Sequence, residues 1–512
     1  MAAQQPLSVQ QNLTIRLLRV LRYNKARIER ALTLMPEKHR PLFHVLPFLV
    51  HVNHEALPGY VAPLTSSETV PFGINNYSFR PDVEQALQRC FPAQSHLFSD
   101  IKQIWPRQRA VDALVLMGSV GTIAQTDDSD FDFWVCIDGK RFSTTELTLL
   151  QQKLTAIEKW ADNTFGIEVH FFLSEIDKVK QNDFGVAEGE SAGSAQALFL
   201  KAEFYNTNIV VAGKAPFWWL TPEKTTEKQY QAIYNSLEKG GSPDVDWFMD
   251  LGHLERLDAS ELFGAAIWQL GKAMDSPFKS VLKMAKLEVY LANISHGQPL
   301  CNLLKKHVHR GAEAPGHVAD IDPYALMFDE LIAHYKANGQ AEDIAVLQQC
   351  LYLKCGCTLS HPLVEGEQAN FKRKIMASYA KQWGWSRKLL AHLDNQQDWT
   401  FNERVQLSRR IHRFLLKCYR RISKEISHHQ QVMDQKDMTV LGRRLSTYYA
   451  KKPDKIEFLR RAFDESLYCE KITIAMRQLK NGDEVWSAYA GDLLSKSGII
   501  DDSQKVTQAT SA

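Results

Sequence analysis

Two aspartates separated by one residue, Asp130 and Asp132, have the types and the spacing to do chemistry. They lie in the run 128–134, where acidic and aromatic residues alternate. In a strand, both carboxylates would project from one face, while Phe131 and Phe133 would face the core. Two adjacent carboxylates repel unless a cation lies between them, and oxygen ligands suit Mg²⁺ or Mn²⁺. The pattern predicts a divalent metal site, with a plain acidic turn as the alternative.

A Gly-Ser pair and a further acid accompany the aspartates. Gly118 and Ser119 follow the short apolar run 113–117. A glycine there lets the chain turn sharply and approach a phosphate closely, and Ser119 adds a hydroxyl and an amide donor. Glu168 lies in the apolar run 166–172 and is a candidate third metal ligand or base. Together these residues favour phosphate chemistry over an acidic turn.

Strands and helices must position these residues. Short apolar or alternating runs predict strands, and apolar residues at three- and four-residue steps predict helices. We expect strands over 113–117, 131–137, 167–173 and 209–212, and helices over 145–160 and 195–205. Strands interleaved with helices over about 110 residues indicate one mixed α/β domain.

The rest of the chain is mainly helical in its pattern. We expect helices over 13–34, 260–274, 278–292, 324–336 and 404–426, and a strand over 471–476. The predicted division is an N-terminal helical region (1–105), a catalytic core (106–220), a helical domain (221–440) and a C-terminal segment (441–512). The fold class is therefore α+β.

Composition excludes several classes of protein. The 512 residues are 45% hydrophobic and 23% charged, which is typical of a globular protein and not of a disordered chain. Lys and Arg number 61 against 59 Asp and Glu, and this balance argues against a dedicated nucleic-acid coat. No run of about 18 apolar residues predicts a membrane span. The eight scattered cysteines and the polar start of the chain indicate a reduced, cytoplasmic protein.

The motifs resemble two nested groups of enzymes. Polymerase-β-type nucleotidyltransferases share a Gly-Ser turn, an Asp-x-Asp strand and a third acid on a neighbouring strand. Within that superfamily the chain resembles the class I adenylate cyclases from about residue 20 to about residue 490. The matching stretches are 117–136, Leu57-Pro-Gly-Tyr60, Gly193-Ser-x-Gln196, Glu203-Phe-Tyr205, Ala212-Gly-Lys214, 261–270 and Asp275-Ser-Pro-Phe-Lys279.

The resemblance implies a polymerase-β-type sheet core embedded in a mainly helical protein. It also implies conversion of ATP to 3′,5′-cyclic AMP and pyrophosphate with two Mg²⁺ or Mn²⁺ ions. The implied catalytic residues and metal ligands are Asp130, Asp132 and Glu168, and the implied nucleotide-binding residues are Gly118, Ser119, Ser129, Trp134 and Lys214. Trp134 would either stack near the nucleotide or wall the site, and Lys214 would either reach the triphosphate or be a solvated loop lysine.

Two other functions stay open at this point. The Asp-x-Asp pattern alone also fits AMP transfer to a protein or small molecule, and a shortened paralogue could bind nucleotide without catalysis. ATP is the expected substrate, without nucleic acid, and a regulatory protein partner is left unidentified. Family members often continue for several hundred residues, so their regulation is not assumed here.

Three further features bear on these expectations. Phe72 stands where enterobacterial members carry a lysine, which puts a phosphate contact from that position in doubt. Cys350, Cys355, Cys357 and His361 lack the spacing of a structural zinc site. The basic segment 404–424 is interpreted as the solvated face of an amphipathic helix.

Overall fold

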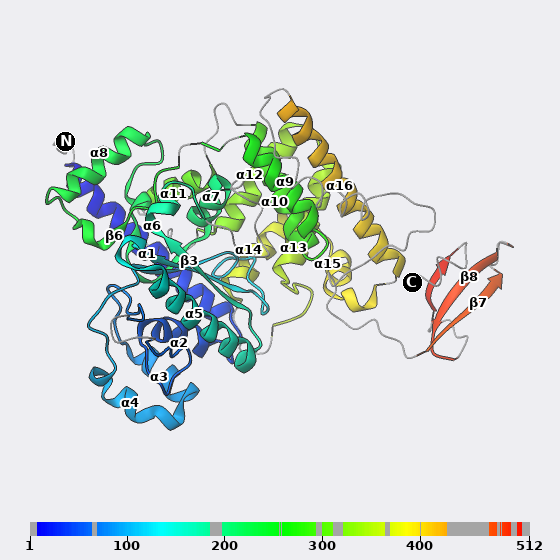
Figure 1. Cartoon of the computed structure of the whole chain (residues 1–512). Coiled ribbons are helices and arrows are strands. Elements are labelled where there is room, and N and C mark those ends of the chain that lie inside the picture. The colour runs from blue at the N-terminus through cyan, green and yellow to red at the C-terminus, as the bar shows by residue number, and fades with distance from the viewer. Residues whose placement is uncertain are drawn as a thin grey trace. The chain divides into compact units, whose positions relative to one another are not determined.

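In the computed structural model, the chain forms two compact units. Figure 1 shows its helices and strands, coloured along the sequence. The first unit comprises Met1–Glu261, Asn293–Asp329 and Asn370–Lys372, and the second comprises Leu262–Ala292, Glu330–Ala369 and Arg373–Ala512. The structure describes residues 8–63, 69–184, 197–254, 256–257, 259–292, 299–310, 321–363, 369–399, 401–427, 471–478, 482, 484–492 and 499–503.

A four-stranded mixed sheet forms the centre of the first unit. Its strands are β1 (Ala113–Met117), β2 (Phe131–Ile137), β3 (Val169–Glu175) and β4 (Ile209–Gly213), in the order β3-β2-β1-β4. β1 runs antiparallel to β2 and β4, whereas β2 and β3 are parallel. The predictions for 113–117 and 131–137 are confirmed to the residue, and the third strand begins two residues later than predicted.

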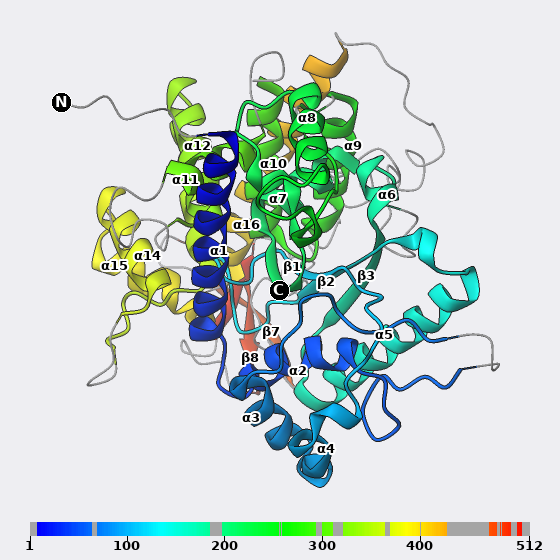
Figure 2. The same ribbon diagram turned by 90° about the vertical axis from the view of Figure 1, so that its left-hand side faces the viewer.

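The two faces of this sheet are covered by different helices. Leu114, Leu116, Phe133 and Val135 are buried on one face and join a large hydrophobic core. Figure 2 shows α2 (Arg40–His51) and α5 (Thr144–Phe165) on one side of the strands and α7 (Ala197–Thr207) on the other. Both faces are buried because successive side chains of a strand point to opposite faces and β1 and β2 are mainly apolar.

Helix α1 (Val9–Leu34) opens the first unit. Ser8 caps it, since the Ser8 hydroxyl accepts from the Gln11 amide and the Gln11 side chain accepts from the Ser8 amide. This unit also contains α3 (Pro81–Cys90), α4 (Ser95–Ser99), α6 (Ile176–Lys180), α8 (Glu227–Glu238), α11 (Leu300–Arg310) and the parallel pair β5 (Ala215–Pro216) and β6 (Phe248–Met249).

Residues on both sides of the predicted boundary at residue 105 contribute to one hydrophobic core. Residues of α2 and α3, such as Leu46, Phe48 and Leu87, belong to the same buried cluster as Phe133 and Ile157. The N-terminal helices therefore cover one face of the sheet, and the ranges 1–105 and 106–220 share one unit.

The second unit is mainly helical. It contains α10 (Pro277–Ala292), α13 (Ala341–Cys355), α14 (Phe371–Gln382), α15 (Arg387–Asp394), α16 (Phe401–Ser427), most of α9 (Ala259–Lys272) and α12 (Pro323–Ala337), and the antiparallel strands β7 (Ile472–Gln478), β8 (Glu484–Ala490) and β9 (Ile499–Ser503). Ile411, Leu415, Cys418 and Ile422 are buried, which confirms the amphipathic pattern of α16. Within the described ranges, no helix has the length and apolar character needed to cross a bilayer.

A buried lysine ties two parts of the first unit together. Lys153, on α5, is fully buried and its ammonium donates to the carbonyl oxygens of Val52 (2.6 Å) and Gly59 (3.1 Å). Gly59 has a positive φ of 83°, and a Cβ there would lie 2.5 Å from Ile157. Burial lowers the pKa of Lys153 to about 7.

The lowered pKa of Lys153 predicts how the free energy of unfolding changes with pH. The unfolded chain should bind a proton at Lys153 up to about pH 10.4, whereas the folded chain releases it near pH 7. We therefore compare the free energy of unfolding of the parent with that of Lys153→Met. The difference, parent minus variant, should increase as the pH rises from about 7 to about 10.4 and decrease again as the pH is lowered. Urea unfolding across this range measures it.

Lys159→Met is the matched control, since Lys159 is exposed on the same helix. Parallel stability profiles for the parent and Lys153→Met would show that the lysine keeps an ordinary pKa in the folded protein.

Candidate functional site

The turn after β1 lies beside the Asp132 carboxylate. Gly118 has a φ of 108°, a conformation that favours glycine, and a Cβ there would lie 3.9 Å from Asp132 Oδ2. Gly118 lies close to this carboxylate because β1 pairs with β2, and Met117 stands opposite Asp132 in that pairing. The glycine turn and the half-buried carboxylate therefore meet at one edge of the sheet.

The other two predicted acids lie at the same edge. Asp130 is exposed and directly precedes β2, and Glu168 directly precedes β3. The Phe131 amide donates to the Glu168 carbonyl at 3.0 Å, and Asp132 stands opposite His170 in the parallel ladder. The register therefore sets all three acids on one face, as the alternation predicts.

The three carboxylates are not gathered into a closed ligand cluster. The Glu168 side chain is 72% exposed, and its Oε2 lies 3.9 Å from His170 Nε2. No group of three or more His, Cys, Asp or Glu side chains in the described part of the chain is arranged to hold a metal ion. The backbone brings the acids to one edge, but the Glu168 side chain lies toward His170.

Two serines link the glycine turn to the segment before β2. Ser119 Oγ and Ser129 Oγ are 3.0 Å apart, and the Thr126 amide donates to Ser129 Oγ at 2.9 Å. Ser129 is 9% exposed. The Ser129 hydroxyl is therefore placed to hold the Ser119 hydroxyl and the Thr126 amide, and its predicted nucleotide contact stays a prediction.

Thr207, at the end of α7, holds the Gly118 amide. Gly118 N donates to Thr207 Oγ1 at 3.1 Å, and Thr207 Oγ1 donates to the Glu203 carbonyl at 2.9 Å. The Gly118 amide is therefore already used as a donor within the protein.

A buried arginine that no local motif indicates lies at this turn. Arg27, on α1, is 0% exposed. Its guanidinium donates to the carbonyls of Gly121 (2.8 Å), Val120 (3.0 Å) and Thr207 (3.0 Å), and to the Tyr23 hydroxyl (3.0 Å). A signal was present, because Arg27 is spaced to continue the buried face of α1 formed by Leu13, Leu17, Val20, Tyr23 and Ala31.

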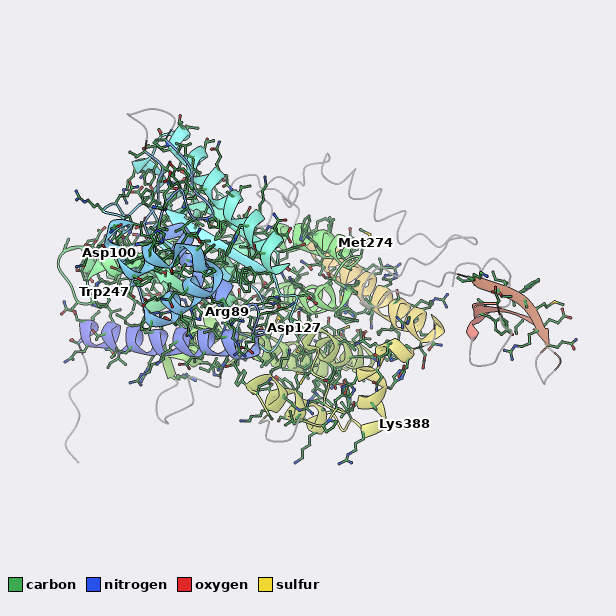
Figure 3. All side chains as sticks on the ribbon, turned by 90° about the horizontal axis from the view of Figure 1, so that it is seen from below. Arg89, Asp100, Asp127, Trp247, Met274 and Lys388 are labelled. Atoms are coloured by element: carbon green, nitrogen blue, oxygen red, sulfur yellow. The ribbon has the colours of Figure 1, made fainter. Side chains whose placement is uncertain are left out.

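A second anchor lies further along the same loop. The Ile123 amide donates to Asp322 Oδ2 at 2.9 Å, and Gln125 joins the Gly121 amide (2.7 Å) to the Ala31 carbonyl (3.1 Å). Burial raises the pKa of Asp322, and hydrogen bonds to its carboxylate oppose that rise. Figure 3 labels Asp127 of this loop close to the end of α1. The loop is therefore tied to α1.

Lys214 does not reach the glycine turn. Its Nζ lies 2.9 Å from Asp112 Oδ1, and its amide donates to the Asp112 carbonyl. Asp112 precedes β1 and Gly118 follows it, so about 20 Å of extended strand separates the two ends. The predicted nucleotide contact of Lys214 is corrected, because antiparallel pairing puts the end of β4 beside the start of β1.

The ring of Trp134 is covered by its packing on α7. It projects from the carboxylate face as predicted, but it is only 3% exposed. Its ring stacks on Phe204 of α7 with centroids 4.2 Å apart, and Phe184 packs against its edge at 5.4 Å. The covering helix leaves no open ring face for a base.

Phe72 lies beside the segment that leads into β1. The Phe72 carbonyl accepts from the Ala110 amide at 3.2 Å, and Ile74 forms a bridge with Val111. This is the start of β1, so the phenylalanine in place of the family's lysine leaves the glycine turn unchanged. The predicted match at 193–196 lies outside the described residues.

Comparison with known proteins gives a consistent set of relatives. The family "Adenylate cyclase NT domain" matches residues 12–219, and "Adenylate cyclase, class-I, second domain" matches residues 257–460. The adenylate cyclase of Proteus mirabilis is 31% identical over 440 residues, which are 85% of this chain and 49% of that protein. That of Yersinia intermedia is 30% identical over 465 residues, 88% of this chain and 51% of that protein.

The adenylate cyclase of Escherichia coli (strain K12) is 30% identical over 442 residues, covering 85% of this chain and 49% of that protein. The chain thus spans about half the length of the curated relatives it matches. No solved structure matches it. With both domain families matched in order along the chain, this protein belongs to the class I adenylate cyclases.

Proposed function

We propose that the chain is an adenylate cyclase that converts ATP to 3′,5′-cyclic AMP and pyrophosphate. Family membership supports the reaction, and the observation that carries the site is the glycine turn beside the Asp132 carboxylate. We further propose that the four-stranded sheet is a polymerase-β-type nucleotidyltransferase core, because its turn, Asp-x-Asp strand and third acid follow that order.

The proposed metal ligands are Asp130 and Asp132, with Glu168 as a third ligand or as the base. The donor set consists of carboxylate oxygens alone, which fits Mg²⁺ or Mn²⁺ better than a softer metal. Asp130 and Glu168 directly precede Phe131 and Val169, which pair across β2 and β3. Rotation of the exposed Glu168 side chain away from His170 would therefore bring its carboxylate toward Asp130. Bound cations would neutralise the triphosphate and favour ionisation of the ribose hydroxyl.

The residues of this chain would mainly orient the nucleotide. The ribose 3′-oxygen loses its proton and bonds to the α-phosphorus, while the bond from that phosphorus to pyrophosphate breaks. Both reacting groups belong to one molecule, so catalysis depends on folding the ribose back on the phosphate. In the proposal, Ser119 and its amide bind the phosphates, and Glu168, where it acts as the base, accepts the 3′-hydroxyl proton.

The direct test is product analysis. Purified protein is incubated with ATP and either Mg²⁺ or Mn²⁺, and the nucleotides are separated. Cyclic AMP with equimolar pyrophosphate is the expected result. AMP attached to another molecule would instead indicate nucleotidyl transfer, and unchanged ATP would indicate a non-catalytic relative.

The carboxylates give the first prediction for activity. Asp130→Asn and Asp132→Asn should each reduce cyclic AMP formation at least about a hundredfold, because a neutral amide loses the charge that holds the cations. Asp127→Asn is the control, since Asp127 is an exposed acid of the same loop. Circular dichroism checks the fold, and a folded Asp132→Asn variant with normal turnover would contradict the metal assignment.

Ser119 gives the second prediction. Ser119→Ala removes one hydrogen bond to a charged phosphate, which is worth about 1.5–3 kcal/mol, so kcat/KM for ATP should fall roughly ten- to hundredfold. Ser99→Ala, on α4, is the control for loss of a serine hydroxyl elsewhere. Equal kcat/KM for the parent and Ser119→Ala would remove Ser119 from the site.

A further inference from the structure

We infer that Arg27 is a positioning residue, which sets the phosphate-binding turn in place for the reaction. The inference rests on the proposed function, because it assumes that the turn after β1 receives the triphosphate. Arg27 acts through the carbonyls of Val120, Gly121 and Thr207, and its buried side chain stays behind the turn.

The guanidinium joins two segments that must keep a fixed separation. Two of its carbonyl partners lie in the turn, and the third is the last residue of α7. The same Thr207 accepts from the Gly118 amide through its hydroxyl. A planar fork of donors holds such carbonyls at defined angles, which a lysine ammonium does not do. Arg27 therefore fixes α7 and the turn as one piece.

The hydrogen bonds of the turn leave two donors for a ligand. The Gly118 amide donates to Thr207 and the Gly121 amide donates to Gln125. The amides of Ser119 and Val120 have no hydrogen-bond partner among the described residues. The Val120 amide shares its peptide plane with the Ser119 carbonyl, which accepts from the amide and the hydroxyl of Thr122. Arg27 holds the carbonyls of the next two peptide planes, those of Val120 and Gly121, and so limits how the backbone that carries the free amides can turn.

Arg27 also adds charge behind these amides. Its hydrogen-bond partners are three carbonyls and a phenol, so no carboxylate forms a direct ion pair with it in the described structure. The negative charge that acts on it is Asp322, which already accepts from the Ile123, Tyr324 and Ala325 amides. A positive charge at this place favours binding of a polyanion in front of the turn.

The test compares Arg27→Lys with Arg16→Lys by steady-state kinetics. Arg16 lies on the same helix and donates to the Leu220 carbonyl at 3.2 Å, outside the turn. Loss of positioning should raise KM for ATP about tenfold or more in Arg27→Lys and also lower kcat, with both values unchanged in Arg16→Lys. A partly unfolded sample would instead lower apparent kcat at constant KM.

Titration with ATP and Ca²⁺, followed by intrinsic tryptophan fluorescence, separates this inference from the proposed function. Weaker binding by Arg27→Lys than by the parent and Arg16→Lys supports the inference even without turnover. If the parent and Arg27→Lys have equal KM and bind ATP equally well, the inference about Arg27 is wrong, while the proposed function is unaffected. A parent that neither binds ATP nor forms cyclic AMP would overturn the proposed function and this inference with it.

A second pair of variants covers the case in which Arg27→Lys does not fold. Thr207→Val keeps the shape of the side chain but removes the acceptor of the Gly118 amide, whereas Thr207→Ser keeps that acceptor. Raised KM in Thr207→Val, with recovery in Thr207→Ser, supports the link between α7 and the turn. Parent kinetics in both would overturn it.

Discussion

The register between β1 and β2 is the constraint on which the site depends. Met117 pairs with Asp132, so the strand that ends in the glycine turn ends beside the carboxylate. A slip of one residue would turn Asp132 toward the core and Phe133 toward the site. That slip is costly, because Phe133 is fully buried and stacks on Phe171 with ring centroids 5.4 Å apart. Packing on the apolar face thus holds the acids on the polar face.

Two helices from distant parts of the sequence hold the turn that the register creates. α7 covers the carboxylate face, where Phe204 stacks on Trp134 and Thr207 accepts from Gly118. α1 reaches the same turn through the guanidinium of Arg27. The buried charge of Arg27 is tolerated because its guanidinium donates hydrogen bonds to carbonyl and hydroxyl oxygens. The site is therefore built by the whole first unit and not by the sheet alone.

Local patterns predict the two central strands. The runs 113–117 and 131–137 are confirmed as strands because a short apolar run closed by Gly118 and an alternation of aromatic and acidic residues are local signals. The Gly-Lys context of Lys214 does not reveal that β4 runs antiparallel to β1, so spacing alone does not show which end of the sheet this lysine occupies. Arg27 and Lys153 have partners about a hundred residues away along the chain, so no local pattern indicates their contacts. The spacing of residue types along the sequence does not indicate contacts between residues so far apart in the chain.

A crystal structure with Mn²⁺ and a non-cyclising ATP analogue would test the central claim most directly. The account predicts anomalous density for Mn²⁺ beside Asp130 and Asp132, with the phosphates against Ser119 and the turn after β1. Metal and phosphates bound at the other end of the sheet, beside Lys214 and Asp112, would contradict it.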